Sequence, residues 1–310
     1  MKIALGQMPE DMRLIEEGRQ ARSAELLDEL PEAQASGEQR RIYSEIRRLS
    51  AVPMVALIYR HLATIPGALE WAWALIEPAM RAGQVQERAW QLAAAAAIPG
   101  DRVIPRAALR VAGIDAAGET AIVEVLDAYN RANPVNIMAV RCLAHHLAGT
   151  VRTSPDAASM PLWRPPTAPA LLPPIVDPDA MDPAVRELVL LLTDRGDTRQ
   201  PSPLWPSLYR HLAHWPAMLG YASVVVAPEF AAIDASAARL RTQVDDAACE
   251  LAQRMVPSKG LAPPVAAQRE RLQAAIDRFS VRIPEMVVIG GLLGRAMPQQ
   301  QQSANERGGM

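Results

Sequence analysis

The sequence is poor in cysteine, with only Cys142 and Cys249 among 310 residues, in unrelated contexts. Two distant thiols supply neither a disulfide framework nor the paired ligands of a metal site. The first residues, MKIALGQMPEDMRLIEE, turn acidic after a few apolar positions, unlike a secretory signal peptide. We therefore expect a protein of the reducing cytoplasm.

The sequence also lacks an excess of charge of one sign and long apolar runs. The net charge is −2, the pI is about 6.2, and no basic tract is present. The longest apolar runs, WQLAAAAAIP and MVVIGGLL, are too short to span a bilayer. Neither a nucleic acid nor a membrane is therefore an expected partner.

Aromatic residues are scarce at 4%, although half of the chain is apolar. Alanine and leucine fill the apolar positions, and both lose little entropy in a helix. No segment alternates with a period of two, whereas helical spacing is steady from RIYSEIRRL onward. The pattern predicts an all-α fold, with helices over 42–50, 54–63, 67–97 and 117–149, a turn over 96–105 and a short helix over 108–115.

Two stretches of the sequence are repeated at one offset. LIYRHLATIP at 57–66 returns as SLYRHLAHWP at 207–216, and AYNRANPVNIM at 128–138 aligns with RFSVRIPEMVV at 278–288. Two independent matches with the same spacing indicate a duplicated unit of roughly 110–120 residues. We expect two tandem helical repeats that form an intramolecular pseudo-dimer.

The repeats and the proline content divide the chain. Residues 153–183 hold nine of the 27 prolines, a composition typical of an extended connector. The predicted organisation is an N-terminal arm (1–40), a first helical repeat (41–150), a proline-rich linker (151–183), a second helical repeat (184–297) and a disordered tail (298–310).

Chemistry is expected where the two copies differ, because a site between symmetric halves becomes specific only through their differences. Asn133 is replaced by Ile283 in the second copy, and Leu57 is replaced by Ser207. Ser207 stands at a helix start, where it is either an N-cap or an anion ligand.

Asn130 and Asn133 lie in the turn before Pro134. A proline inside a helix frees a backbone carbonyl and bends the helix. Polar side chains there either satisfy the freed group or face a ligand. We favour the first role for Asn130 and leave both open for Asn133.

The histidines favour structural roles. Tyr-Arg-His occurs in both copies, at 59–61 and 209–211, which indicates packed tyrosines and a surface Arg-His pair at the seam between the repeats. Catalysis by His61 or His211 is the alternative. His145 and His146 are expected to be a solvated or capping pair, and His214 a loop residue.

Three quoted stretches, taken together, are similar to motifs of a known family. VPMVALIYRHLATIPGALEWAW, NRANP and SLYRHLAHWP resemble, in order and spacing, motifs of the group I 2-haloacid dehalogenases over roughly residues 40–297. The resemblance implies an all-α pseudo-dimer with its site between the repeats and no cofactor. It implies hydrolysis of 2-haloalkanoic acids to 2-hydroxy acids by direct attack of water. The expected partner is a small 2-substituted carboxylate, and the chain would act as a monomer or homodimer.

The resemblance also assigns roles to individual residues. It places the catalytic asparagine at Asn133, apolar pocket residues at Met54 and Leu57, a carboxylate-binding serine at Ser207 and further substrate contacts at Leu208 and Tyr209. The family's catalytic aspartate falls on Leu208, which cannot accept a proton.

Two alternatives to this dehalogenase assignment follow from Leu208. A different small-carboxylate enzyme could draw its base from Asp194, Asp197 or His211. A non-catalytic small-ligand-binding or interaction protein could keep only the scaffold.

Overall fold

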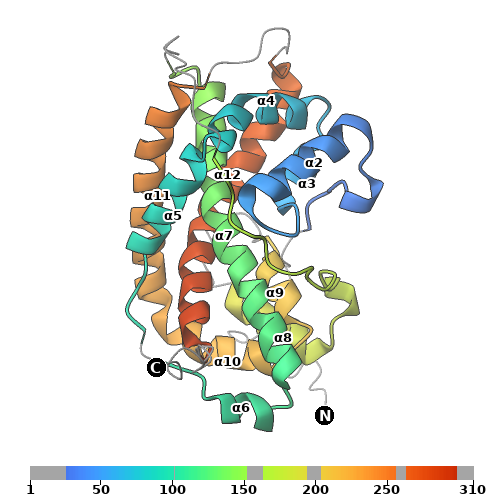
Figure 1. Ribbon diagram of the computed structural model, residues 1–310, viewed down its shortest axis with the longest axis vertical. Coiled ribbons are helices and arrows are strands. Elements are labelled where there is room, and N and C mark those ends of the chain that lie inside the picture. The colour runs from blue at the N-terminus through green and yellow to red at the C-terminus, as the bar shows by residue number, and fades with distance from the viewer. Residues whose placement is uncertain (1–25, 101, 152–162, 194–203, 256–262, 299–310) are drawn as a thin grey trace, which may run out of the picture.

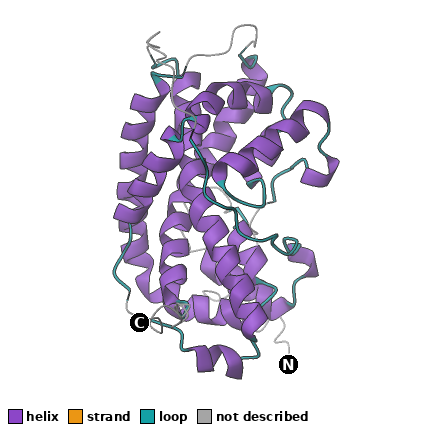
Figure 2. Cartoon of the chain, in the orientation of Figure 1, coloured by secondary structure: helices purple, strands orange, loops and turns teal. Residues whose placement is uncertain are grey.

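The computed structural model describes residues 26–100, 102–151, 163–193, 204–255 and 263–298. These residues form helices and loops and contain no strand, which confirms the predicted all-α class (Figure 2). The helices are α2 (Gly37–Ser50), α3 (Leu57–Leu62), α4 (Ala68–Arg81), α5 (Gln84–Ala95), α6 (Arg106–Val111), α7 (Ala116–Leu147), α8 (Pro183–Thr193), α9 (Ser207–Leu212), α10 (Pro216–Val226), α11 (Phe230–Ala252) and α12 (Ala266–Ala296), with short 3-10 helices η2 (Glu32–Gln34), η3 (Pro178–Ala180) and η4 (Ala227–Glu229).

Several predicted boundaries were wrong. The helix expected over 67–97 is two helices, α4 and α5, because Gly83 adopts a left-handed φ of 74° between them. The helix expected from residue 54 begins at Leu57. The helix expected from residue 42 begins earlier, at Gly37, and residues 26–36 hold only η2. The rest of the arm and residues 299–310 of the predicted tail lie outside the described residues.

The centre of the molecule is the pair of long helices α7 and α12 (Figure 1). Helices α5 and α11 pack beside them, while α3 and α9 contact α12 and α7 respectively. Both long helices carry an internal proline, Pro134 and Pro284. The pair thus forms the frame on which the shorter helices sit.

Asn130 ties the two central helices together. Its Nδ2 donates to the carbonyl oxygen of Gly290 at 3.1 Å. Its Oδ1 would lie 2.4 Å from a Cβ atom added to Gly290. The predicted role for Asn130, satisfying the carbonyl freed by Pro134, is therefore wrong, since its amide bonds α12 instead.

Replacing Gly290 by alanine is expected to lower the free energy of unfolding by about 1–3 kcal/mol, because the added methyl overpacks against Asn130. Gly220 in α10 is the matched control, since a Cβ there meets nothing within 4 Å. Gly220→Ala should stabilise the protein by about 0.5–1 kcal/mol through helix propensity. Urea unfolding of both variants, and of Gly290→Ala combined with Asn130→Ala, checks this. The free energy of unfolding should fall less in the double variant than the sum of the decreases in Gly290→Ala and Asn130→Ala.

The described part of the proline-rich linker, residues 163–177, runs without a helix across several elements. At one end the Trp163 backbone N–H donates to Arg81 O at 3.0 Å. Further along, Arg131 Nη1 donates to Thr167 O at 2.6 Å. At the other end the side chains of Arg210, His211 and His214 bond its carbonyls. The linker is thereby fastened to both predicted repeats.

One described stretch, Pro216–Ala252, is long and apolar enough by length and composition to cross a membrane. It consists of α10, η4 and α11, and core helices of soluble proteins meet the same criterion. The finding is weak evidence for a membrane.

Candidate active site

A cavity of about 70 Å³ lies where α3 and α9 meet the central helices α7 and α12. Most of its lining residues form pairs 150 positions apart in the sequence: Met54 and Leu204, Val55 and Trp205, Ala56 and Pro206, Leu57 and Ser207, Ile58 and Leu208, Tyr129 and Phe279, Ala132 and Arg282, Asn133 and Ile283, Asn136 and Met286. The segments that the sequence analysis aligned at this offset thus both contribute to one space.

The structure brings most of the predicted site residues together in this cavity. Asn133, Met54, Leu57, Ser207 and Leu208 all line it, although they come from three distant segments. Tyr209, the sixth predicted site residue, is fully buried and does not line the cavity.

Ser207 does not act as the N-cap of α9. Pro206 occupies the N-cap position, and Ser207 is the first residue of the helix. The N-cap alternative for Ser207 is therefore wrong, and Ser207 lines the cavity.

The cavity has a neutral polar half and a mainly apolar half. Helices α7 and α9, which contact each other, contribute Tyr129, Asn133, Asn136 and Ser207. The equivalent positions on α12 and α3 are Phe279, Ile283, Met286 and Leu57. The hydroxyl and amide groups therefore lie mainly on one side of the cavity, and apolar side chains stand at the equivalent positions on the other side.

A buried hydrogen-bond network lies behind the polar half. The Tyr129 hydroxyl bonds His211 Nδ1 at 2.7 Å, and His211 Nε2 bonds the linker carbonyl of Pro173 at 2.9 Å. Burial raises the pKa of the Tyr129 phenol, while Arg60 and then Ser207, whose hydroxyl is within hydrogen-bonding reach, lower it less strongly. Burial lowers the pKa of His211 to about 4, and the nearby His214, Arg210 and Arg60 act in the same direction.

Arg210 and His211 are buried, at 8% and 2% exposure, so the predicted surface pair was wrong. In the first copy Arg60 O accepts from Leu30 N at 2.9 Å, and His61 Nδ1 bonds Asp28 O at 2.7 Å.

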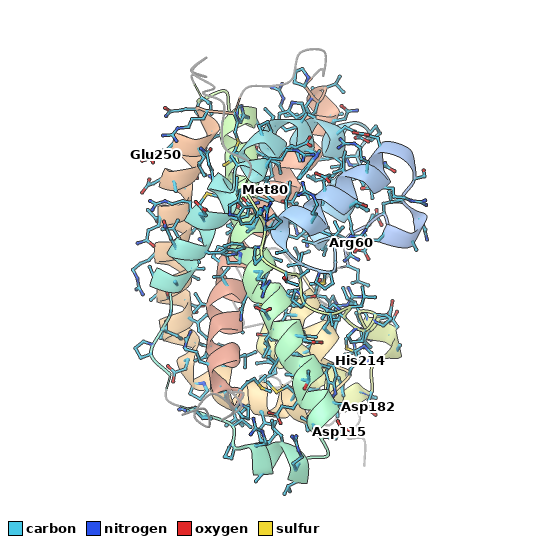
Figure 3. All side chains as sticks on the ribbon, in the orientation of Figure 1. Arg60, Met80, Asp115, Asp182, His214 and Glu250 are labelled. Atoms are coloured by element: carbon cyan, nitrogen blue, oxygen red, sulfur yellow. The ribbon has the colours of Figure 1, made fainter. Side chains whose placement is uncertain are left out.

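The second copy repeats the arrangement on the linker. Arg210 O accepts from Val176 N at 3.4 Å, and His211, which corresponds to His61, bonds Pro173 O through Nε2 at 2.9 Å. The nearby His214 Nε2 bonds Pro174 O at 2.7 Å (Arg60 and His214 are labelled in Figure 3). The repeated motif thus fastens an extended segment onto each copy. His214 lies in the loop after α9, as expected.

Two arginines that the sequence analysis did not assign to the site, Arg60 and Arg282, line the cavity. Arg60 Nη2 pairs with Glu29 Oε2 at 3.0 Å, and its buried Nε has no acceptor among the described residues. Arg282 pairs with Glu285 at 2.7 Å and donates to Thr193 O at 3.2 Å. Arg282 replaces Ala132 of the first copy, and this difference between the copies was the signal that could have found it.

No protein-family model and no curated protein matches the sequence. Among solved structures, the chain is similar to a D-2-haloacid dehalogenase mutant in complex with D-2-CPA, with a TM-score of 0.66, 18% identity and coverage of 88% of this chain and 97% of that chain. A structure of D-2-haloacid dehalogenase with L-LA gives a TM-score of 0.65, 17% identity and the same coverage.

The fold is that of D-2-haloacid dehalogenase. At this level of identity the likeness shows the shared helical architecture over nearly the whole of the compared chains.

Within this dehalogenase fold, no aspartate or glutamate of the described residues lines the cavity. Asp194 and Asp197, the predicted substitute bases, lie outside the described residues. No group of three or more His, Cys, Asp or Glu side chains in the described ranges could hold a metal ion. Burial raises the pKa of the Cys142 thiol to about 12, so it is a poor nucleophile.

His145 and His146 differ from the predicted solvated or capping pair. His145 Nε2 pairs with Asp245 of α11 at 3.2 Å. His146 Nε2 is buried with no partner among the described residues, and burial lowers its pKa. Neither histidine lines the cavity.

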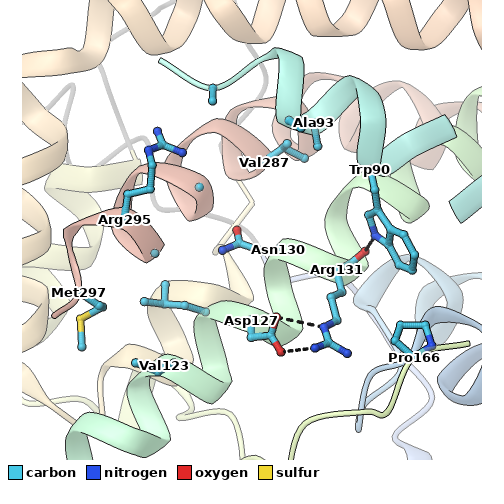
Figure 4. A pocket seen from close by; sticks show the side chains of 15 residues that line it. Trp90, Ala93, Val123, Asp127, Asn130, Arg131, Pro166, Val287, Arg295 and Met297 are labelled. Atoms are coloured by element: carbon cyan, nitrogen blue, oxygen red, sulfur yellow. Dashed lines mark hydrogen bonds and ion pairs between the residues drawn. The ribbon is translucent and has the colours of Figure 1, made fainter. Parts of the chain in front are cut away.

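A wider groove of about 710 Å³ lies between α5, α7 and α12 (Figure 4). Its wall includes the Asp127–Arg131 ion pair at 2.7 Å and Trp90, whose Nε1 donates to Arg131 O at 3.1 Å. None of the predicted site residues lines it. We therefore take the smaller cavity as the candidate active site.

Proposed function

We propose that this protein is a cofactor-independent hydrolase that converts small 2-haloalkanoic acids to 2-hydroxy acids by direct attack of water. One observation carries the proposal: residues from three motifs, represented by Met54, Asn133 and Ser207, line one small cavity in a chain with the D-2-haloacid dehalogenase fold. A cavity of about 70 Å³ favours acids of two or three carbons.

We further propose that the cavity lies on the pseudo-two-fold axis of an intramolecular pseudo-dimer. Nine pairs of lining residues at an offset of 150 support this arrangement. The domain boundaries predicted from the sequence belong to the same proposal. We propose a cytoplasmic monomer or homodimer without a nucleic acid, membrane or cofactor partner.

The halves of the cavity suggest how the substrate is held. Arg60 and Arg282 are placed to attract the carboxylate, and the buried Arg60 Nε lacks an acceptor among the described residues. A guanidinium donates to carboxylate oxygens in a fixed geometry. Met54, Leu57 and Phe279 would pack against the alkyl group and halogen and exclude competing water.

In the reaction, Asn133 would orient a water molecule towards C2. The water oxygen forms a bond to C2 while the carbon–halogen bond breaks, and the halide leaves with the bonding electron pair. The configuration at C2 is therefore inverted. Leu208 stands at the position that the family resemblance assigns to the catalytic aspartate, so the proton of water must go elsewhere.

Halide release from each enantiomer of 2-chloropropionate tests the function. We expect measurable release by the wild type and a rise of about 10²-fold in Leu208→Asp, the lower end of what a positioned base contributes. Leu208→Asn is the control, because it has nearly the same shape but cannot accept the proton. Chiral analysis of the 2-hydroxypropionate should show inversion.

Absence of halide release from the wild type and from Leu208→Asp would exclude the dehalogenase function. If Leu208→Asn raises halide release as much as Leu208→Asp does, a polar side chain at this position, rather than a base, increases the rate. If the cavity still binds 2-hydroxypropionate in a calorimetric titration without any turnover, the protein is a small-carboxylate binder on this scaffold.

A further inference from the structure

The hydrogen-bond directions behind the cavity follow from the Pro173 carbonyl. A carbonyl only accepts, so His211 Nε2 carries the hydrogen of their 2.9 Å bond. Neutral imidazole then has a bare Nδ1, which accepts from the Tyr129 hydroxyl at 2.7 Å. Ser207 lies within hydrogen-bonding reach of the same phenol oxygen, and because the hydrogen of Tyr129 is used on His211, a bond between the two hydroxyls can only run from Ser207 to Tyr129.

Ser207 consequently presents lone pairs, and no hydrogen, to the cavity that it lines. A carboxylate oxygen also offers only lone pairs, so Ser207 cannot hold it by a hydrogen bond. A water molecule, in contrast, can donate to Ser207 Oγ. The geometry therefore suits Ser207 as a partner of the attacking water, and leaves the carboxylate to Arg60 and Arg282.

The equivalent positions of the other half lack this network. His61 corresponds to His211, but Phe279 replaces Tyr129 and Leu57 replaces Ser207, so both hydroxyls are missing. His61 also has the opposite tautomer, because its Nδ1 donates to the carbonyl of Asp28 at 2.7 Å. The histidine is common to both copies, and only one copy connects it to the cavity.

We propose that Ser207, Tyr129 and His211 form a proton relay that carries the proton of the attacking water out of the cavity to a buried imidazole. This inference rests on the proposed hydrolysis and supplies the base that Leu208 cannot. As the oxygen–carbon bond forms and halide leaves, water gives its proton to Ser207 Oγ. Ser207 gives its own to Tyr129, and Tyr129 gives its own to His211 Nδ1. The imidazolium later releases the proton to solvent.

The charges around His211 set its strength as a base. Tyr129 faces it from α7, Arg60 from α3, and Arg210 and His214 from its own segment. Its pKa is lowered to about 4, chiefly by burial, so the imidazole is neutral at pH 7. The relay thus ends in a buried ring nitrogen that can accept a proton.

Steady-state kinetics distinguish this role from carboxylate binding. Ser207→Ala should lower kcat by about 10²-fold with KM changed less than threefold, as expected for loss of a general base. Tyr129→Phe and His211→Gln should each lower kcat to a similar extent, and their combination should cost no more than either alone. His61→Gln, the equivalent change in the other half, should leave kcat unchanged.

The pH profile and an NMR spectrum complete the test. In the wild type kcat should fall below pH 4–5 as His211 becomes protonated, and this limb should be absent in His211→Gln. The ¹⁵N spectrum of the resting protein should show His211 with hydrogen on Nε2 and a bare Nδ1.

The experiments distinguish a failure of the proposed hydrolysis from a failure of the relay. A wild type without halide release refutes the relay, and absence of release from Leu208→Asp as well refutes the proposed hydrolysis. An active wild type in which Ser207→Ala raises KM alone, or in which Tyr129→Phe keeps full kcat, overturns the relay and leaves the hydrolysis standing. A ¹⁵N spectrum that shows hydrogen on His211 Nδ1 would also refute the relay, regardless of the measured activity.

Discussion

Gly83→Ala is expected to lower the free energy of unfolding by about 2–4 kcal/mol, the sum of a strained backbone and an overpacked contact. Gly83 has a φ of 74°, where a side chain is strained. A Cβ atom would also lie 2.4 Å from Cγ of Trp163, a ring held by its backbone bond to Arg81 and by its contact with Trp90 at 5.9 Å. The substitution therefore strains the α4–α5 junction and displaces the linker from it.

The variant Gly67→Ala separates the cost of the strained backbone from the cost of the contact with Trp163. It has a φ of 71°, but a Cβ atom there meets nothing within 4 Å. Gly67→Ala should cost only about 1 kcal/mol, the backbone term alone. Urea unfolding monitored by circular dichroism measures both variants, and tryptophan fluorescence reports on Trp163 and Trp90. Equal losses in the two variants would show that the linker does not press on Gly83.

Lowering the pH from 7 to 4 is expected to cost about 3 kcal/mol of stability through His211 alone, at 1.36 kcal/mol per pKa unit. Burial lowers its pKa from 6.5 to about 4. Between these values the unfolded chain binds a proton that the folded protein does not. Stability is therefore complete above pH 6.5, decreases as the pH falls towards 4, and loses nothing further from this group below that.

His211→Gln and His61→Gln provide the comparison. Unfolding free energies at pH 7, 5.5 and 4 should fall less steeply in His211→Gln than in the wild type. His61→Gln, at the equivalent position, should keep the steep dependence of the wild type. Carboxylates with lowered pKa, such as Glu45 and Glu119, are common to all three proteins and cancel in the differences. Parallel curves for all three would refute a buried neutral His211.

The sequence predicted the helical class and five of the residues that line the cavity because both depend on local pattern and spacing. Apolar periodicity without strand alternation was enough for the all-α class. The constant offset between the Leu57 and Ser207 segments, and between Asn133 and Ile283, marked equivalent positions, and such positions meet when two similar units pack face to face. The resemblance to the group I 2-haloacid dehalogenases assigned functional roles to these positions.

Only the tertiary structure decided which polar groups meet. The break at Gly83 lies in an uninterrupted apolar pattern, and the bond from Asn130 to Gly290 joins residues 160 positions apart. The contact between Tyr129 and His211 spans 82 positions and is completed by a linker carbonyl that no pattern marks. Helix periodicity specifies which face of a helix is buried, but burial of a polar group depends on partners from other segments, and these are fixed only when the helices pack.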